Sequence, residues 1–154
     1  PYLIGHIVAW SEIEAFNQRT LFGNVDAVMD YNPLPLQLGR DLILNDSLVS
    51  TYIVRRFDYW NGVAENRRIK FIPSVVPGFN NTKAPSQVSK RAPVIQRTEE
   101  GFRAFLSKSK PFMNAGLHIT SYNEWFEGTQ IERAKEYGRT YLDILKEQLS
   151  SEIA

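Results

Sequence analysis

Short apolar segments alternate with longer segments that carry helix signals along this chain of 154 residues. The apolar segments, which we expect to be strands, lie at 2–9, 25–29, 69–75 and 117–121. Strands separated by helices favour a parallel sheet with right-handed crossovers. The sequence therefore predicts an α/β fold of four consecutive β–α units with parallel strands, in a single domain over residues 1–154.

The segments between the strands carry recognisable start and stop signals of helices. A capping box opens the first expected helix at 11–14. An apolar stripe runs along the second, from 46 to 66. Thr98 is expected to cap the third, which Pro111 ends, and the last is expected to begin near Gly138.

Composition excludes several classes of protein. A net charge of +1 gives no electrostatic case for nucleic acid. The absence of Cys excludes disulfides and thiol catalysis, and with two His we expect no metal site and no cofactor. No segment approaches the roughly 18 consecutive apolar residues of a membrane span. No signal peptide is visible, so a soluble, cytoplasmic protein is the default expectation.

Two carboxylates, Glu124 and Glu127, lie just past the expected end of the fourth strand. Two Glu residues at this spacing usually lie on the solvent-exposed face of a helix. Here Gly128 is expected to end any such helix, and Trp125 lies between the two acids. Active sites of α/β proteins form beyond the carboxyl ends of their strands. An acid, a second carboxylate and an aromatic face are what sugar cleavage requires. The pair therefore indicates a carbohydrate site with both Glu residues as catalysts.

Polar and aromatic residues follow the other expected strands as well. Because the loops after parallel strands converge on one rim, we expect these side chains in the same cleft as the acids. The candidate substrate-binding residues are Tyr31, Asn32, Phe79, Asn80, Asn123 and Trp125. For residues 30–33 a simple turn is as good an interpretation as a substrate-binding role. For Phe79, packing within its loop is as good an interpretation as substrate binding. His6 and His118 are expected to be buried, hydrogen-bonded residues rather than catalysts.

Three blocks of the sequence resemble glycoside hydrolase family 99, the endo-α-mannosidase family. The most specific is ITSYNEWFEGTQIE at 119–132, followed by FIPSVVPGFNNT at 71–82 and RTEEGF at 97–102. Their order and spacing also fit the family. Phe126 stands where the family usually has His, and Asn81 where it usually has Asp, so the identity of the sugar stays open.

The resemblance implies a (β/α)8 barrel, which typically needs about 250 residues. This chain would then resemble the C-terminal half of such a barrel. By position, Glu127 matches the family's general acid/base, and Glu124 matches the other catalytic carboxylate, which is thought to act on the sugar's own 2-hydroxyl. The implied reaction is a retaining, metal-independent cleavage within α-linked, mannose-type glycans, with a carbohydrate as the ligand.

A half barrel exposes its inward face and its sheet edges. We therefore expect a homodimer, or association with a missing N-terminal half, that buries upwards of about 1,000 Å².

Two other functions stay open. One is a non-catalytic carbohydrate-binding or structural remnant of such a barrel. The other is a glycan-assembly, glycosyltransferase-like protein, which would need a nucleotide- or lipid-linked donor. No Gly-rich phosphate loop is present in the sequence.

Overall fold

The computed structural model describes residues 1–7, 22–83 and 93–150. Its principal strands pair in parallel and follow one another in chain order, with β1 beside β2, β2 beside β4, and β5 beside β7. They are β1 (Ile4–Ile7), β2 (Ala27–Asp30), β4 (Lys70–Ile72), β5 (Ser74–Val75) and β7 (His118–Ile119). The predicted α/β fold with parallel strands is confirmed.

The third expected strand, at 69–75, is divided in two by Pro73. Proline has no N–H and cannot donate to a neighbouring strand. Its carbonyl still accepts a hydrogen bond of 2.9 Å from the backbone N–H of His118. The segment therefore pairs with β2 through β4 and with β7 through β5.

A second, smaller sheet was not expected from the sequence. It pairs β3 (Leu42–Ile43) with β6 (Ile95–Gln96) in parallel, and Phe79 forms an antiparallel bridge to Ile95. Strands of two residues carry no detectable period. The four expected β–α units therefore do not include this pair of strands. The helix expected to open at 11–14 and to end at Gly23 lies almost entirely outside the described residues.

Side-chain caps fix where two helical segments begin. Asn45 Oδ1 accepts from the N–H of Leu48 at 2.9 Å, and Thr98 Oγ1 accepts from the N–H of Gly101 at 2.9 Å. The segment expected at 46–66 is one helical run with a π-helical turn inside it. The helices are η1 (Leu36–Leu38), α2 (Asp46–Leu48), η2 (Val49–Ile53), α3 (Val54–Asn66), α4 (Glu99–Ser109), η4 (Lys110–Ala115) and α5 (Thr140–Ser150).

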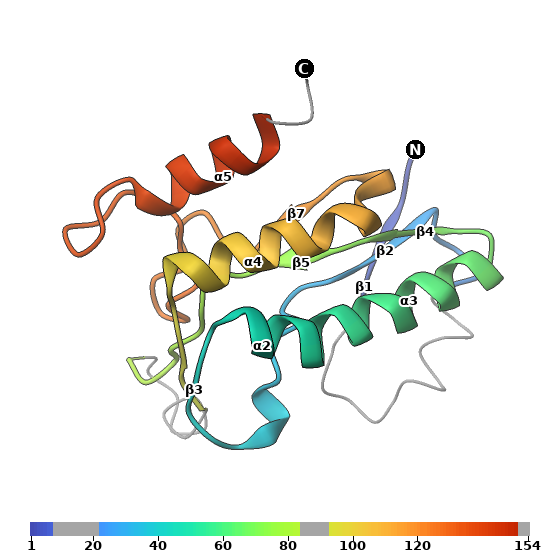
Figure 1. Ribbon diagram of the computed structural model, residues 1–154. Coiled ribbons are helices and arrows are strands. Elements are labelled where there is room, and N and C mark those ends of the chain that lie inside the picture. Colours follow the sequence, from blue (N-terminus) through green and yellow to red (C-terminus); the bar gives the residue numbers. More distant parts are fainter. Residues whose placement is uncertain (8–21, 84–92, 151–154) are drawn as a thin grey trace.

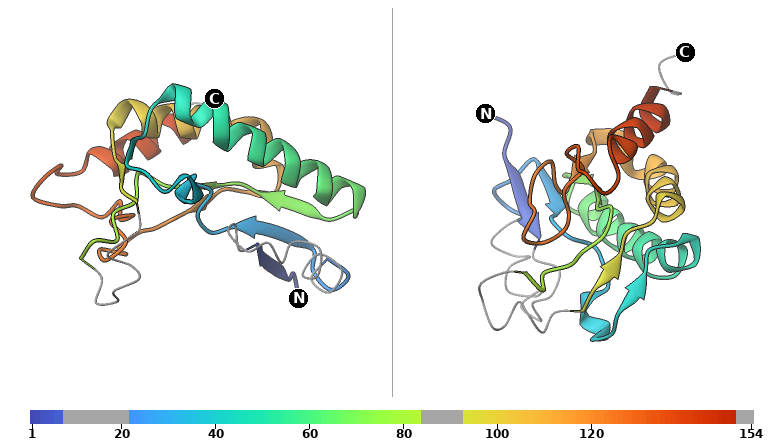
Figure 2. Two further views of the ribbon diagram at one scale, coloured as in Figure 1. Left: turned by 90° about the horizontal axis from the view of Figure 1, so that it is seen from below. Right: turned by 90° about the vertical axis from the view of Figure 1, so that its left-hand side faces the viewer.

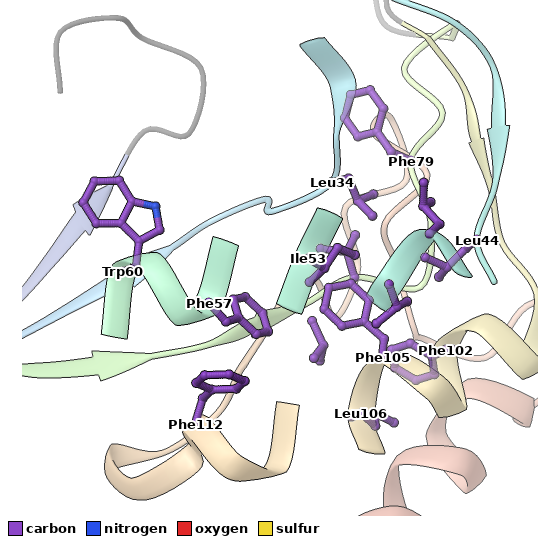
Figure 3. Packing of buried hydrophobic residues seen from close by; sticks show 14 of the residues in the cluster. Leu34, Leu44, Ile53, Phe57, Trp60, Phe79, Phe102, Phe105, Leu106 and Phe112 are labelled. Atoms are coloured by element: carbon purple, nitrogen blue, oxygen red, sulfur yellow. The ribbon is translucent and has the colours of Figure 1, made fainter. Parts of the chain in front are cut away.

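Helices α3, α4 and α5 lie on one side of the strands (Figures 1 and 2). Aromatic side chains of α3 and α4 point toward each other and toward β4, and they form the centre of the core (Figure 3). Phe57 packs on the rings of Phe71, Phe105 and Phe112 at centroid distances of 5.5–6.1 Å. Burying each such ring stabilises the fold by about 2–3 kcal/mol.

The other face of the sheet is not covered by any helix within the described ranges (Figure 2). In β1, Gly5 and Ile7 are buried toward the helices, whereas Ile4 is 50% exposed and His6 is also exposed. This alternation places Ile4 and His6 on the uncovered face. Separately, none of the helices in the described part of the chain has the length and apolar character needed to cross a membrane.

Candidate active site

The loops that follow β2, β5 and β7 lie at the same end of the sheet (Figure 1). Two hydrogen bonds join them directly. Thr120 Oγ1 donates to the carbonyl of Tyr31 at 2.6 Å, and the N–H of Asn80 donates to the carbonyl of Glu127 at 2.7 Å. Segments from three parts of the chain therefore form one rim.

The acid loop, residues 121–132, folds back on itself through backbone and side-chain contacts. Ser121 Oγ accepts from the N–H of Glu124 at 2.9 Å, and the Ser121 N–H donates to the carbonyl of Thr129 at 2.9 Å. Gly128 has a φ of +63°, a conformation that favours glycine. A Cβ at Gly128 would also lie 3.1 Å from Asn80. The loop thus needs glycine directly after Glu127.

Glu127 is half-buried and accepts a hydrogen bond from Tyr31, with 3.2 Å between the phenolic oxygen and Oε2. Burial raises the pKa of Glu127, the hydrogen bond from Tyr31 opposes this rise, and the charge of Glu124 adds to it. Burial and the two carboxylates raise the pKa of Tyr31 to about 12. Tyr31 is therefore a neutral donor, and Glu127 holds a proton more readily than an ordinary glutamate.

Glu124 is half-buried on the same loop. Its Oε1 accepts from the N–H of Phe126 at 3.1 Å. The carboxylate is near enough to raise the pKa values of both Tyr31 and Glu127. Two carboxylates and a phenol therefore form one electrostatically coupled group.

Two histidines flank Tyr31. His6 Nε2 accepts from the Tyr31 N–H at 3.1 Å, and the ring centroids of His6 and His118 lie 5.6 and 6.3 Å from that of Tyr31. His118 Nδ1 lies 3.0 Å from Ser74 Oγ and 3.2 Å from Thr120 Oγ1. Burial lowers the pKa of His118, and His6 adds to this effect. Both rings are hydrogen-bonded as expected, although His6 is exposed.

Asn80 and Trp125 line a cleft of about 370 Å³ beside the acid loop, together with Gln96, Arg97 and Tyr137. Glu124 and Glu127 are not among the residues that line it. Trp125 is 45% exposed, and its indole N–H donates to Glu132 Oε2 at 3.0 Å. Asn123 is exposed on the same loop. These three expected substrate-binding side chains reach the surface.

Asn32 and Phe79 are buried, with 4% and 5% of their surface exposed. Asn32 Oδ1 accepts from the N–H of Leu34 at 3.1 Å, which forms a tight turn after β2. Phe79 belongs to the hydrophobic core. Asn32 therefore belongs to the scaffold of the rim, whereas Phe79, although buried, is also one of the residues that line the cleft beside the acid loop.

Arg97 is a residue that sequence reasoning did not single out as part of the site. It donates to the carbonyls of Gly128 and Gln130 on the acid loop. In the sequence, Arg97 is marked only by its position in the segment 97–102 that resembles family 99. That position does not indicate its contact with Gly128, 31 residues away. Among the described residues, no group of three or more acidic or His side chains is placed to hold a metal ion.

A family model described as glycosyltransferase WbsX matches residues 14–145. The glycoprotein endo-α-1,2-mannosidase of Mus musculus is 33% identical over 101 residues, which are 58% of this chain and 21% of that protein. The human glycoprotein endo-α-1,2-mannosidase-like protein is 34% identical over 105 residues, 59% of this chain and 21% of that one. This chain thus spans about a fifth of the length of these curated relatives.

Solved structures share the fold. A glycoside hydrolase-like protein superposes with a TM-score of 0.67 at 23% identity, over 96% of this chain and 43% of its own. The GH99 endo-α-mannosidase from Bacteroides thetaiotaomicron superposes with a TM-score of 0.60 at 20% identity, over 99% of this chain and 48% of its own. The resemblance to family 99 that the sequence predicted is confirmed over part of the chain.

Proposed function

This chain belongs to the family described as glycosyltransferase WbsX, and we propose that it carries the acid pair of a glycoside hydrolase acting on α-linked, mannose-type glycans. The observation that carries the proposal is the hydrogen bond of 3.2 Å from Tyr31 to the half-buried Glu127. It joins the loop after β2 to the loop after β7. The raised pKa of Glu127 gives that carboxyl the property that a general acid needs near neutral pH.

In this proposal Glu127 acts first as acid and then as base. It donates its proton to the glycosidic oxygen as the bond to the anomeric carbon breaks. The resulting carboxylate then removes a proton from the water that attacks in the second step. Tyr31 keeps Glu127 Oε2 in one orientation during both steps, because a neutral phenol donates to the carboxyl group in either state.

Glu124 is the proposed partner base. It accepts the proton of the sugar's 2-hydroxyl, whose oxygen attacks the anomeric carbon, and it returns that proton when water opens the intermediate. An internal hydroxyl held in place has a large proximity advantage over an external nucleophile. Two displacements give net retention of configuration, and the sequence of steps uses no metal ion and no cofactor.

The substrate would lie against the exposed part of the rim. Trp125 offers a ring that its bond to Glu132 holds in place, and Asn80 and Asn123 offer amide groups beside it. Aromatic faces stack on sugars, and amides bond their hydroxyl groups. The names of the mouse and human relatives support cleavage within a mannose-type glycan rather than at its end.

The same proposal makes the chain one half of a (β/α)8 barrel. The solved structures match 96–99% of this chain with 43–48% of their own length, which supports that reading. The uncovered face that carries Ile4 and His6 would be the barrel interior. The remaining strands would come from a longer polypeptide, from a second copy or from a partner chain.

The description of the matching family favours a second function, glycosyl transfer during glycan assembly. The same acid pair could serve both reactions, with a sugar hydroxyl in place of water as the acceptor. Measuring whether the protein consumes a nucleotide sugar distinguishes glycosyl transfer from hydrolysis. A transferase consumes an activated donor, whereas the proposed hydrolase cleaves a glycan when no donor is present.

The test uses the complete protein that carries this chain. A glycan array identifies ligands, and hydrolysis of the bound glycans is then measured for the wild type and for Glu127→Gln. We expect release of mannose-containing fragments by the wild type and a loss of about 10²–10⁴-fold in the variant, the typical contribution of a general acid. Binding without cleavage by the wild type would refute the hydrolase and favour a non-catalytic carbohydrate-binding protein.

A further inference from the structure

Arg97 occupies a fixed position between two tyrosines. It follows β6 and precedes the N-cap residue of α4. Its guanidinium carbon lies 4.8 Å from the ring centroid of Tyr137 and 4.8 Å from that of Tyr141. The two rings meet edge to face at 5.0 Å. A guanidinium group stacked on two aromatic rings loses little further freedom when it donates hydrogen bonds.

The stacked guanidinium group holds the acid loop from its C-terminal side. Nη1 donates to the carbonyl of Gln130 at 3.0 Å, and Nη2 donates to the carbonyl of Gly128. Tyr137 also donates its hydroxyl to the Gln130 carbonyl, at 3.4 Å. The N–H of Asn80 holds the carbonyl of Glu127 itself. The two peptide units that directly follow Glu127 are therefore tied to other parts of the fold.

We propose that Arg97 is a positioning residue, which holds the backbone at Gly128 and Gln130 so that the Glu127 carboxyl group stays within hydrogen-bond reach of Tyr31. This inference rests on the proposed role of Glu127 as the general acid. Arg97 acts through geometry rather than through its field, because burial, Tyr31 and Glu124 account for the shifted pKa of Glu127. Lysine cannot replace it, since an ammonium group lacks the planar fork that reaches two carbonyls.

The distinguishing measurement is how the rate depends on the leaving group. A misplaced general acid strongly slows the cleavage of glycosides whose leaving group must be protonated. It has much less effect on activated aryl glycosides, whose leaving group needs little protonation. In the complete protein, Arg97→Lys should lower kcat/KM by about tenfold to a hundredfold for a mannose-type oligosaccharide with an alkyl leaving group, because kcat/KM reports the step in which that group departs. For the same oligosaccharide with an activated aryl leaving group the loss should be less than about threefold.

Hydrogen–deuterium exchange supplies a readout that does not depend on activity. Arg97→Lys should speed amide exchange in the peptide 121–132 and leave the α3 peptide 54–66 unchanged. The control is Arg103→Lys, because Arg103 forms an exposed ion pair with Glu147 on the outer helices, with 2.6 Å between Nη1 and Oε2. This control should change neither the rates nor the exchange of 121–132.

Unchanged exchange at 121–132 in Arg97→Lys would overturn the inference. Equal losses on both substrates, together with a lower melting temperature, would also overturn it, because they indicate a purely structural role. If the wild type cleaves no glycoside, the proposed function fails, and the exchange result alone then decides whether Arg97 positions the loop.

Discussion

At the scale of single residues, the site depends on one contact between distant parts of the chain. Tyr31 and Glu127 are 96 positions apart, and their side chains meet because the loops after β2 and β7 share a rim. The hydrogen bond orients the carboxyl group, while burial raises its pKa. The hydrogen bond from Tyr31 therefore affects both the orientation of Glu127 and its pKa, which burial raises and the bond lowers.

Tyr31→Phe should change both properties of Glu127, and a pH–rate profile reports each of them on a different axis. The hydrogen bond from Tyr31 lowers the pKa of Glu127, so its removal should raise that pKa further. A general acid works in its protonated form, and activity is lost as pH rises through its pKa. The alkaline limb of the pH–rate profile should therefore move to higher pH, while the maximal rate falls by about tenfold because the carboxyl group is less well oriented. A pH–rate profile of kcat for both proteins measures the two effects.

The control is Tyr59→Phe, which removes a phenol that is 50% exposed on α3. Its profile should match that of the wild type. A shift of the alkaline limb to lower pH in Tyr31→Phe would contradict the assigned electrostatics.

At the scale of elements, the sequence was sufficient to predict the longer helices and strands, whereas the shortest strands were found only in the structure. The sequence predicted the parallel strands and the helices α3, α4 and α5, because each has an apolar pattern several residues long. It missed β3 and β6, whose pairing depends on backbone groups that are distant in sequence. It placed Glu124 and Glu127 correctly beyond a strand end, but it had no means of detecting the reach of Arg97 across the fold.

Two glycines in helices test how tightly α4 packs. A Cβ on Gly101 would lie 2.2 Å from the carbonyl oxygen of Leu44, whereas Gly62 in α3 has no neighbour within 4 Å. Gly101→Ala should lower the free energy of unfolding by more than about 2 kcal/mol, because backbone cannot move aside cheaply. Gly62→Ala should raise it by about 0.5–1 kcal/mol through helix propensity. Urea denaturation measures both, and similar effects of the two substitutions would contradict the close packing of α4 on Leu44, the residue that follows β3.

At the scale of the whole molecule, the described helices cover one face of the sheet, and β1 leaves Ile4 exposed on the other. Apolar surface of this kind is stabilised when another surface covers it, by about 25 cal/mol per Å². We therefore expect another surface to cover this face in the complete protein.

Light scattering of this chain expressed alone, at tens of micromolar, tests whether a second copy covers the exposed face. We expect a mass above that of the monomer, and Ile4→Asp should reduce it because a charge would enter the contact. Ile43→Asp is the matched control, since Ile43 is 52% exposed on β3, in the smaller sheet. A monomer mass for the unsubstituted chain would mean that its own residues suffice to cover the face.

The most direct test of the central claim, that Glu127 is the acid of a retaining glycosidase, is the configuration of the product when it first forms. The complete protein and its Glu127→Gln variant are mixed with an α-linked mannose-type glycan, and the newly released reducing sugar is followed by proton NMR before it equilibrates. We expect the α-anomer to appear first and Glu127→Gln to slow its release by about 10²–10⁴-fold. A β-anomer as the first product, or equal rates for the two proteins, would contradict this role of Glu127.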